Sequence, residues 1–268
     1  MRARNTINIY HRMKILRPLL IALLPLIHIA VFLTLGLTEH YILWVLPVVF
    51  LITDLLLLPL TPPRASWSVR LSTTLPSILL ILSSLGLYLF LEDTALFARV
   101  AVIVANALLQ GIYLFNLYSY SYRSEHYQER SLSHVSSYMN MLIVFYSSCL
   151  LFASIFFIDI PIWYLIAPFV VIIMGVTTQS LWIDGIKIRA QGYLWIAMPI
   201  IMVELLYVLL WLPSFYYVNG LVIAIWYTCL MHVGISSARK ELEKREIAIT
   251  TIIAIFVIVL LMLTARWR

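Results

Sequence analysis

The sequence predicts an all-α integral membrane protein, a polytopic bundle of about nine transmembrane helices. Of its 268 residues, 63% are hydrophobic and 11% are charged, and the mean hydropathy is +0.99. A soluble domain of this length carries about 25% charged residues, so most of this surface must face lipid or other apolar helices. The apolar residues form long runs, and the basic residues concentrate in alternate gaps between them.

Each apolar run is long enough for a helix that crosses a bilayer, which takes roughly 20 residues. The runs lie near residues 18–37, 41–60, 75–91, 97–118, 137–157, 162–182, 194–212, 217–235 and 247–264. They are too long and too uniformly apolar for the alternating strands of a membrane barrel. No gap has room for a soluble domain, so we expect residues 1–268 to form a single integral membrane domain.

The basic residues predict the orientation. Fifteen of the 18 Lys and Arg residues fall before the first run or after an even-numbered run. They are Arg2, Arg4, Arg12, Lys14, Arg17, Arg64, Arg70, Arg123, Arg130, Lys187, Arg189, Arg239, Lys240, Lys244 and Arg245. By the positive-inside rule, we expect the N-terminal segment 1–17 to be cytoplasmic and the C-terminus to lie outside. The membrane expected for the protein is the plasma (cytoplasmic) membrane. Arg266 and Arg268 at the C-terminus do not fit the positive-inside rule in this orientation. If the ninth run does not cross the membrane, the C-terminus stays inside and these two residues fit the rule.

Two segments outside the runs have alternative interpretations. The N-terminus resembles a signal peptide, but its apolar run is about 20 residues long and no small-residue cleavage site follows, which predicts a retained first helix. Residues 118–137 form the longest cytoplasmic loop expected. This loop is either a solvated connector with a tyrosine anchor, or an interfacial helix, a partner surface or a gate. The net charge of +6 belongs to the topology pattern, so we expect no nucleic-acid partner.

The spacing of the prolines favours four tandem helical hairpins followed by a final helix. Pro25, Pro76 and Pro199 each precede an expected outer turn by about 14–16 residues, while Pro47 and Pro168 follow one by about 8–9 residues. Internal repeats are common in transporters, whose sites form at repeat interfaces and broken helices. The alternative is that proline is simply more frequent in membrane helices than in soluble ones.

Two carboxylates lie within the runs. Glu204 is near the middle of the seventh run and Asp54 is in the second. A charge at mid-bilayer costs roughly 2.5–3.5 kcal/mol on insertion scales, so it normally faces the bundle interior and a partner. Each carboxyl group is either a proton- or cation-carrying site or a hydrogen-bonded contact between helices.

Histidines and cysteines give no pattern of a metal site. His28 and His232 lie in the first and eighth runs, and no helix holds two histidines at ligand spacing. Ordinary buried histidines are the better interpretation. Cys149 and Cys229 lie in apolar runs and are expected to be buried thiols. We therefore predict no metal, no cofactor and no catalytic constellation.

A stripe of polar residues follows the fourth run. Asn106, Gln110, Tyr113 and Asn116 are separated by offsets of 4, 7 and 10 residues from the first, which keeps them on about a third of the helix circumference. Polar groups cannot all face lipid without cost. The stripe therefore faces a cavity or other polar helices.

The polar residues of several helices have similar expected depths. Asp54, Asn106, Gln110, Gln179 and His232 lie on second helices of the expected hairpins, roughly 14–20 residues past the turn. This placement predicts one polar layer in the inner half of the bundle. The alternative is hydrogen-bonded helix packing, worth about 0.6–2 kcal/mol per bond.

Three function classes remain. The first is a transporter or permease-like protein for a small solute or lipid, with Glu204 and Asp54 as coupling carboxylates and the fourth-helix stripe as cavity lining. The second is an accessory or scaffold subunit of a membrane complex, whose partner is another membrane protein. The third is a lipid-modifying enzyme, which ranks lowest because no catalytic motif is found. The bilayer itself is the one expected partner common to all three.

Overall fold

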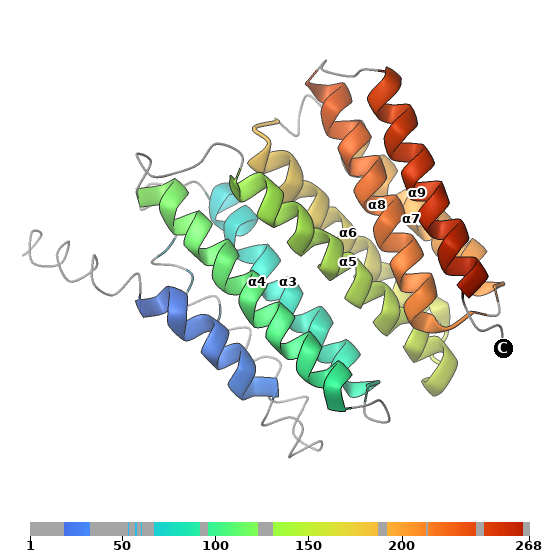
Figure 1. Cartoon of the computed structure of the whole chain (residues 1–268), viewed down its shortest axis with the longest axis horizontal. Coiled ribbons are helices and arrows are strands. Elements are labelled where there is room, and N and C mark those ends of the chain that lie inside the picture. Colours follow the sequence, from blue (N-terminus) through green and yellow to red (C-terminus); the bar gives the residue numbers. More distant parts are fainter. Residues whose placement is uncertain are drawn as a thin grey trace, which may run out of the picture. The chain divides into compact units, whose positions relative to one another are not determined.

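The computed structural model describes residues 19–32, 53, 57, 60, 67–91, 96–122, 131–186, 192–212, 214–239 and 244–264. These residues are 93% helical, include no strand and form eight helices (Figure 1), which confirms the predicted helical bundle class. The helices are Leu19–Phe32, α3 (Trp67–Leu89), α4 (Leu96–Tyr122), α5 (Ser131–Ile158), α6 (Ile162–Ile183), α7 (Gly192–Leu210), α8 (Tyr216–Ala238) and α9 (Lys244–Thr264).

Six of these helices, α3 to α8, are long and apolar enough to cross a membrane. The chain is therefore an integral membrane protein. Helix Leu19–Phe32 and the apolar part of α9, Ile247–Leu263, are shorter apolar segments. The predicted second run, 41–60, lies outside the described residues apart from Thr53, Leu57 and Leu60, so nine remains an approximate number of spans.

Several helices are longer than the apolar runs that predict them. Helix α3 begins at Trp67 and α5 begins at Ser131, each several residues before its run, while α4 continues to Tyr122. Serine, threonine and tyrosine residues at these ends lower the local hydropathy without interrupting the helix. Of the loop expected over 118–137, residues 123–130 lie outside the described part.

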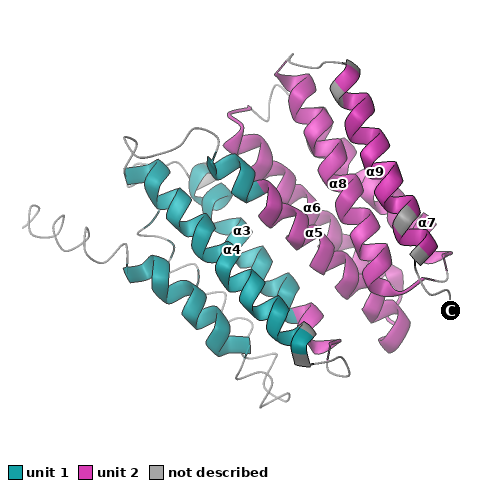
Figure 2. Ribbon diagram, viewed as in Figure 1, with its two compact units in different colours: residues 1–85, 93–136 teal, residues 86–92, 137–268 magenta. Residues whose placement is uncertain are grey.

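The chain divides into two compact units, which are drawn in different colours in Figure 2. Unit 1 comprises residues 1–85 and 93–136, and unit 2 comprises residues 86–92 and 137–268. In unit 1, α4 contacts both α3 and helix Leu19–Phe32. The Tyr113 hydroxyl donates a hydrogen bond of 2.9 Å to the Thr73 carbonyl of α3, and a Cβ added at Gly111 would lie 3.4 Å from the Pro25 ring.

In unit 2, α7 packs against α6 and α8, and α9 packs against α8; α8 and α9 run side by side in Figure 1. Two glycines allow close approach. A Cβ at Gly220 would clash with the Cys149 sulfur and lie 3.1 Å from the Cys149 backbone nitrogen, and one at Gly234 would lie 2.7 Å from Leu194. Small residues of this kind let membrane helices pack closely.

Local hydrogen bonds stabilise two turns of unit 2. Gly185, at φ 71°, ends α6, and the amides of Gly185 and Ile186 bond to the carbonyls of Trp182 and Leu181, the pattern of a Schellman cap. Between α7 and α8, buried Asn219 accepts a hydrogen bond from Ser214 and donates one of 3.3 Å to the Leu209 carbonyl.

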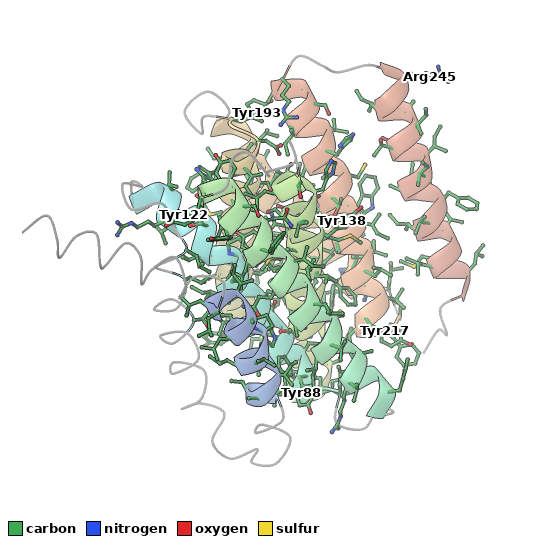
Figure 3. All side chains as sticks on the ribbon, turned by 60° about the vertical axis from the view of Figure 1, so that its left-hand side comes forward. Tyr88, Tyr122, Tyr138, Tyr193, Tyr217 and Arg245 are labelled. Carbon is green, nitrogen blue, oxygen red and sulfur yellow. The ribbon has the colours of Figure 1, made fainter. Side chains whose placement is uncertain are left out.

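Helices α7, α8 and α9 of unit 2 run in alternating directions. Figure 3 shows Tyr193 and Arg245 at one end of the unit and Tyr88 and Tyr217 at the opposite end. Tyr193 and Arg245 are the second residues of α7 and α9, whereas Tyr217 is the second residue of α8. Tyrosines near both ends match the aromatic belts of membrane interfaces.

Candidate functional site

A buried polar cluster in unit 1 joins helix Leu19–Phe32 to α4. His28 Nδ1 lies 2.7 Å from the Gln110 side-chain oxygen, and the His28 ring stacks on Phe32 with 5.0 Å between ring centroids. Asn106, one turn before Gln110, is 0% exposed, as is Gln110 itself. Residues at i and i+4 of a helix are neighbours on one face, so Asn106 lies on the same face of α4 as Gln110. These two residues and His28 are called here the unit 1 cluster.

The rest of the α4 stripe is tied to neighbouring helices. Tyr113 is fully buried and bonded to α3. Asn116 is half-buried; its amide nitrogen donates 2.9 Å to the Ile112 carbonyl and its oxygen accepts a hydrogen bond from Ser131. The sequence predicts that the stripe shares one face, and the burial of Asn106, Gln110 and Tyr113 agrees with that prediction.

Four side-chain atoms of this cluster have no hydrogen-bond partner among the described residues. They are His28 Nε2, Gln110 Nε2, Asn106 Nδ2 and Asn106 Oδ1. With the Gln110 oxygen as acceptor, His28 Nδ1 carries the proton of a neutral ring, and Nε2 is then an acceptor. The cluster therefore offers two acceptors, from His28 and Asn106, and two amide donors, from Asn106 and Gln110.

A second polar cluster lies in unit 2, between α5 and α6. The Asn140 amide nitrogen donates hydrogen bonds to the Gln179 oxygen, to the Ser180 hydroxyl at 2.8 Å and to the Val176 carbonyl at 3.4 Å. Asn140 is 1% exposed and Gln179 is 0% exposed. These bonds connect two membrane-spanning helices, which is the helix-packing role that the sequence leaves open for Gln179.

Helices α7 and α8 add further polar groups near the second cluster. The Trp195 indole of α7 donates 2.9 Å to the Thr178 hydroxyl of α6. The Tyr227 hydroxyl of α8 lies close to the side chains of Thr177 and Ser180, although the Tyr227 and Thr177 oxygens are not in well-formed hydrogen-bond geometry. No sequence pattern selects Tyr227, because one tyrosine in an apolar helix carries no periodic signal.

Two of the predicted site residues have exposed side chains and are not members of the buried clusters, so the interpretation of His232 as a buried histidine is wrong. Glu204 of α7 and His232 of α8 both have exposed side chains. Asp54 lies outside the described residues. Of the predicted polar layer, Asn106 and Gln110 are together in unit 1, and Gln179 belongs to unit 2.

His28 is a functional candidate that the sequence pattern does not indicate. It is 2% exposed and contacts Gln110 of a helix 82 positions later, so no local pattern indicates the pairing. Cys149 and Cys229 are buried free thiols, as expected. Among the described residues, no group of three or more His, Cys, Asp or Glu is placed to hold a metal ion.

The chain matches no protein-family model, no curated protein and no solved structure with which it was compared. The structure therefore shows the class of the protein, an integral membrane protein built from apolar helices, and two buried polar clusters within it.

Proposed function

We propose that the protein binds a small, uncharged polar solute inside the membrane and passes it across, as a transporter or permease does. The main support for this proposal is the environment of Asn106. Its side chain is 0% exposed, and both its amide atoms lack a hydrogen-bond partner among the described residues. An unsatisfied buried polar group costs about 1–3 kcal/mol, so a hydrogen-bonding guest in contact with Asn106 would be stabilised.

The unpaired atoms of His28, Asn106 and Gln110 indicate which kind of solute would bind there. His28 Nε2 and Asn106 Oδ1 require donors, while the Asn106 and Gln110 amide nitrogens require acceptors. The described side chains of this cluster carry no carboxylate, lysine or arginine. A molecule with both a donor and an acceptor but no net charge satisfies these groups, which describes water, a polyol or an amide.

A role in helix packing alone accounts less well for this cluster. Asn140 in unit 2 shows what a packing asparagine looks like, since its amide nitrogen donates to three acceptors on the adjacent helix, although its oxygen, like that of Asn106, has no partner among the described residues. Asn106 is equally buried but makes none of the bonds that such a role requires. The difference between these two asparagines supports a ligand at Asn106.

The test is solute permeation through liposomes that contain the purified protein. Stopped-flow light scattering would follow water, glycerol and urea separately. We expect at least one permeability to exceed that of protein-free liposomes. Substitution Asn106→Leu, which keeps the side-chain size and removes both amide atoms, should return it to the protein-free value.

Asn116→Leu is the matched control, because it changes the same residue type in the same helix at a half-buried site bonded to Ile112 and Ser131. It should leave permeation unchanged. If wild-type liposomes are no more permeable than empty ones to all three solutes, or if both leucine variants behave alike, Asn106 is not a passage site for such solutes.

An accessory subunit of a membrane complex is the second candidate. The exposed position of Glu204 favours it, because a carboxyl group on the outside of a membrane helix needs a partner that this chain does not provide among its described residues.

A further inference from the structure

Three buried oxygen atoms of unit 2 have no hydrogen-bond partner among the described residues. They are Asn140 Oδ1 of α5, Thr177 Oγ1 of α6 and the Tyr227 hydroxyl of α8. The three residues are 0–2% exposed. Buried polar atoms in proteins are nearly always paired, so these oxygens are candidates to bind a further group.

The three oxygens gather near the Ser180 hydroxyl. The Asn140 amide nitrogen donates a hydrogen bond of 2.8 Å to it, and the Tyr227 hydroxyl lies close to the side chains of Thr177 and Ser180. Thr177 precedes Ser180 by three residues, so their side chains are neighbours on one face of α6. Asn140, Thr177 and Tyr227, from three helices, are called here the unit 2 site.

The Thr177 hydroxyl is not used within its own helix. Threonine hydroxyls in helices commonly bond to the carbonyl four residues earlier. Thr178 bonds in this way to the Met174 carbonyl at 2.7 Å, and Thr228 to the Ala224 carbonyl at 2.8 Å. Thr177 makes no such bond among the described residues, so its hydroxyl is available to a ligand.

A direct bond between the two hydroxyl groups would not satisfy the site. A hydroxyl group both donates and accepts, whereas Asn140 Oδ1 only accepts. If the Tyr227 hydroxyl donated to Thr177, these two groups would pair with each other. Asn140 Oδ1 would still lack a donor among the described residues, so a further donor is required.

The three atoms match the chemistry of one hydroxyl group. A ligand O–H can donate its proton to Asn140 Oδ1, and its oxygen can accept from the hydroxyls of Thr177 and Tyr227. The three side chains carry no charge, and an ion buried without an opposite charge is very costly, so the ligand is uncharged. The unit 1 cluster differs, since two of its unpaired atoms are amide nitrogens that require acceptors.

We propose that the unit 2 site binds a small uncharged molecule through a hydroxyl group, the chemistry that water and a polyol such as glycerol share. Ser180 is four residues before Asp184, the C-cap of α6. About 6 Å of helix, at 1.5 Å per residue, therefore separates the site from the end of this span, which is near the water. The binding does not depend on solute passage at the unit 1 cluster.

Solid-state NMR of the full chain in liposomes tests the site, with carbon-labelled asparagine in a deuterated chain. Proton magnetisation that starts on water would be transferred to the side-chain amide carbons. Asn219 is the internal control, because it is 0% exposed and its amide atoms bond to Ser214 and to the Leu209 carbonyl. We expect transfer to Asn140 at a mixing time that gives none to Asn219.

A second sample, in deuterated water with glycerol, identifies the source of the hydroxyl group. Magnetisation then starts on the C–H protons of glycerol. Transfer to Asn140 from water alone assigns the site to a water molecule, and transfer from glycerol assigns it to a polyol. Both results support the proposal.

Two variants make the result specific to the hydroxyl groups. Tyr227→Phe and Thr177→Val each remove one hydroxyl and keep the side-chain shape, and each should abolish the transfer to Asn140. An unshifted Asn219 signal shows that the variant is folded. Thr228→Val is the matched control, because the Thr228 hydroxyl bonds to a carbonyl of its own helix, and it should leave the transfer unchanged.

Two results would overturn the proposal. In the first, Asn140 receives no more magnetisation than Asn219 from water or from glycerol. In the second, the transfer persists in Tyr227→Phe or in Thr177→Val. The first result needs only the wild-type chain, so it decides even if a variant fails to fold. The Asn106 signal in the same spectra reports separately on the unit 1 cluster.

Discussion

The Arg239 guanidinium donates a 2.6 Å hydrogen bond to the Asp184 carboxylate, and the two residues cap the C-terminal ends of α8 and α6. The gaps that follow α6 and α8 therefore begin at the same end of unit 2. Both gaps are rich in basic residues. The alternating pattern of charges in the sequence predicts this placement, since gaps that follow even-numbered runs fall on one side of the membrane.

Reporter fusions test the orientation of the whole chain. A fusion after residue 130 should report the cytoplasm and a fusion after residue 92 the opposite side, because Arg123 and Arg130 are retained inside by the positive-inside rule. Alkaline phosphatase and a fluorescent protein would be compared at each site. If the two positions report the same side, the assignment of the helices between them is wrong.

The ion pair itself should contribute little to stability. Asp184 is 9% and Arg239 27% exposed in their side chains, and partly exposed pairs are worth about 0–1 kcal/mol. Asp184→Asn should lower the melting temperature in detergent only slightly, and less at high salt. The exchanged pair Asp184→Arg with Arg239→Asp should recover the loss; failure to recover it would mean that Asp184 acts mainly as a helix cap.

Gly220→Ala should destabilise unit 2 by about 1–3 kcal/mol, the usual cost of overpacking. The new methyl group would meet the Cys149 sulfur and backbone. Gly192→Ala is the control, because nothing lies within 4 Å of a Cβ there. Adding Cys149→Ala should restore part of the loss, since it removes the nearest atom, and thermal unfolding of the double variant measures that coupling. Additive losses would contradict the close approach.

The two buried asparagines should respond in opposite ways to leucine. Asn140→Leu breaks bonds to Gln179 and Ser180 and should lower the free energy of unfolding by about 1–3 kcal/mol. Asn106→Leu removes two atoms that have no partner, so stability without solute should stay equal or rise. Thermal unfolding in detergent compares them, and equal losses would place Asn106 among the packing residues.

Much of the fold follows from the sequence alone. Runs of about 20 apolar residues specify membrane helices because the bilayer core leaves backbone groups no other partners. The stripe of Asn106, Gln110 and Tyr113 is equally predictable, because helical periodicity places these residues on one face whatever surrounds them. Their burial follows from the cost of exposing amides to lipid.

Only the tertiary structure determines which helix faces meet. The pairing of His28 with Gln110, and of Asn140 with Gln179, joins residues 82 and 39 positions apart, beyond any local pattern. Helix α7 shows the physical reason. Its packed side chains are apolar, and so are most of its exposed ones, such as Ile196, Ile200 and Val208, because lipid tails are as apolar as a helix interface. Hydrophobicity therefore predicts that α7 spans the membrane, whereas packing alone decides that Glu204 faces outward.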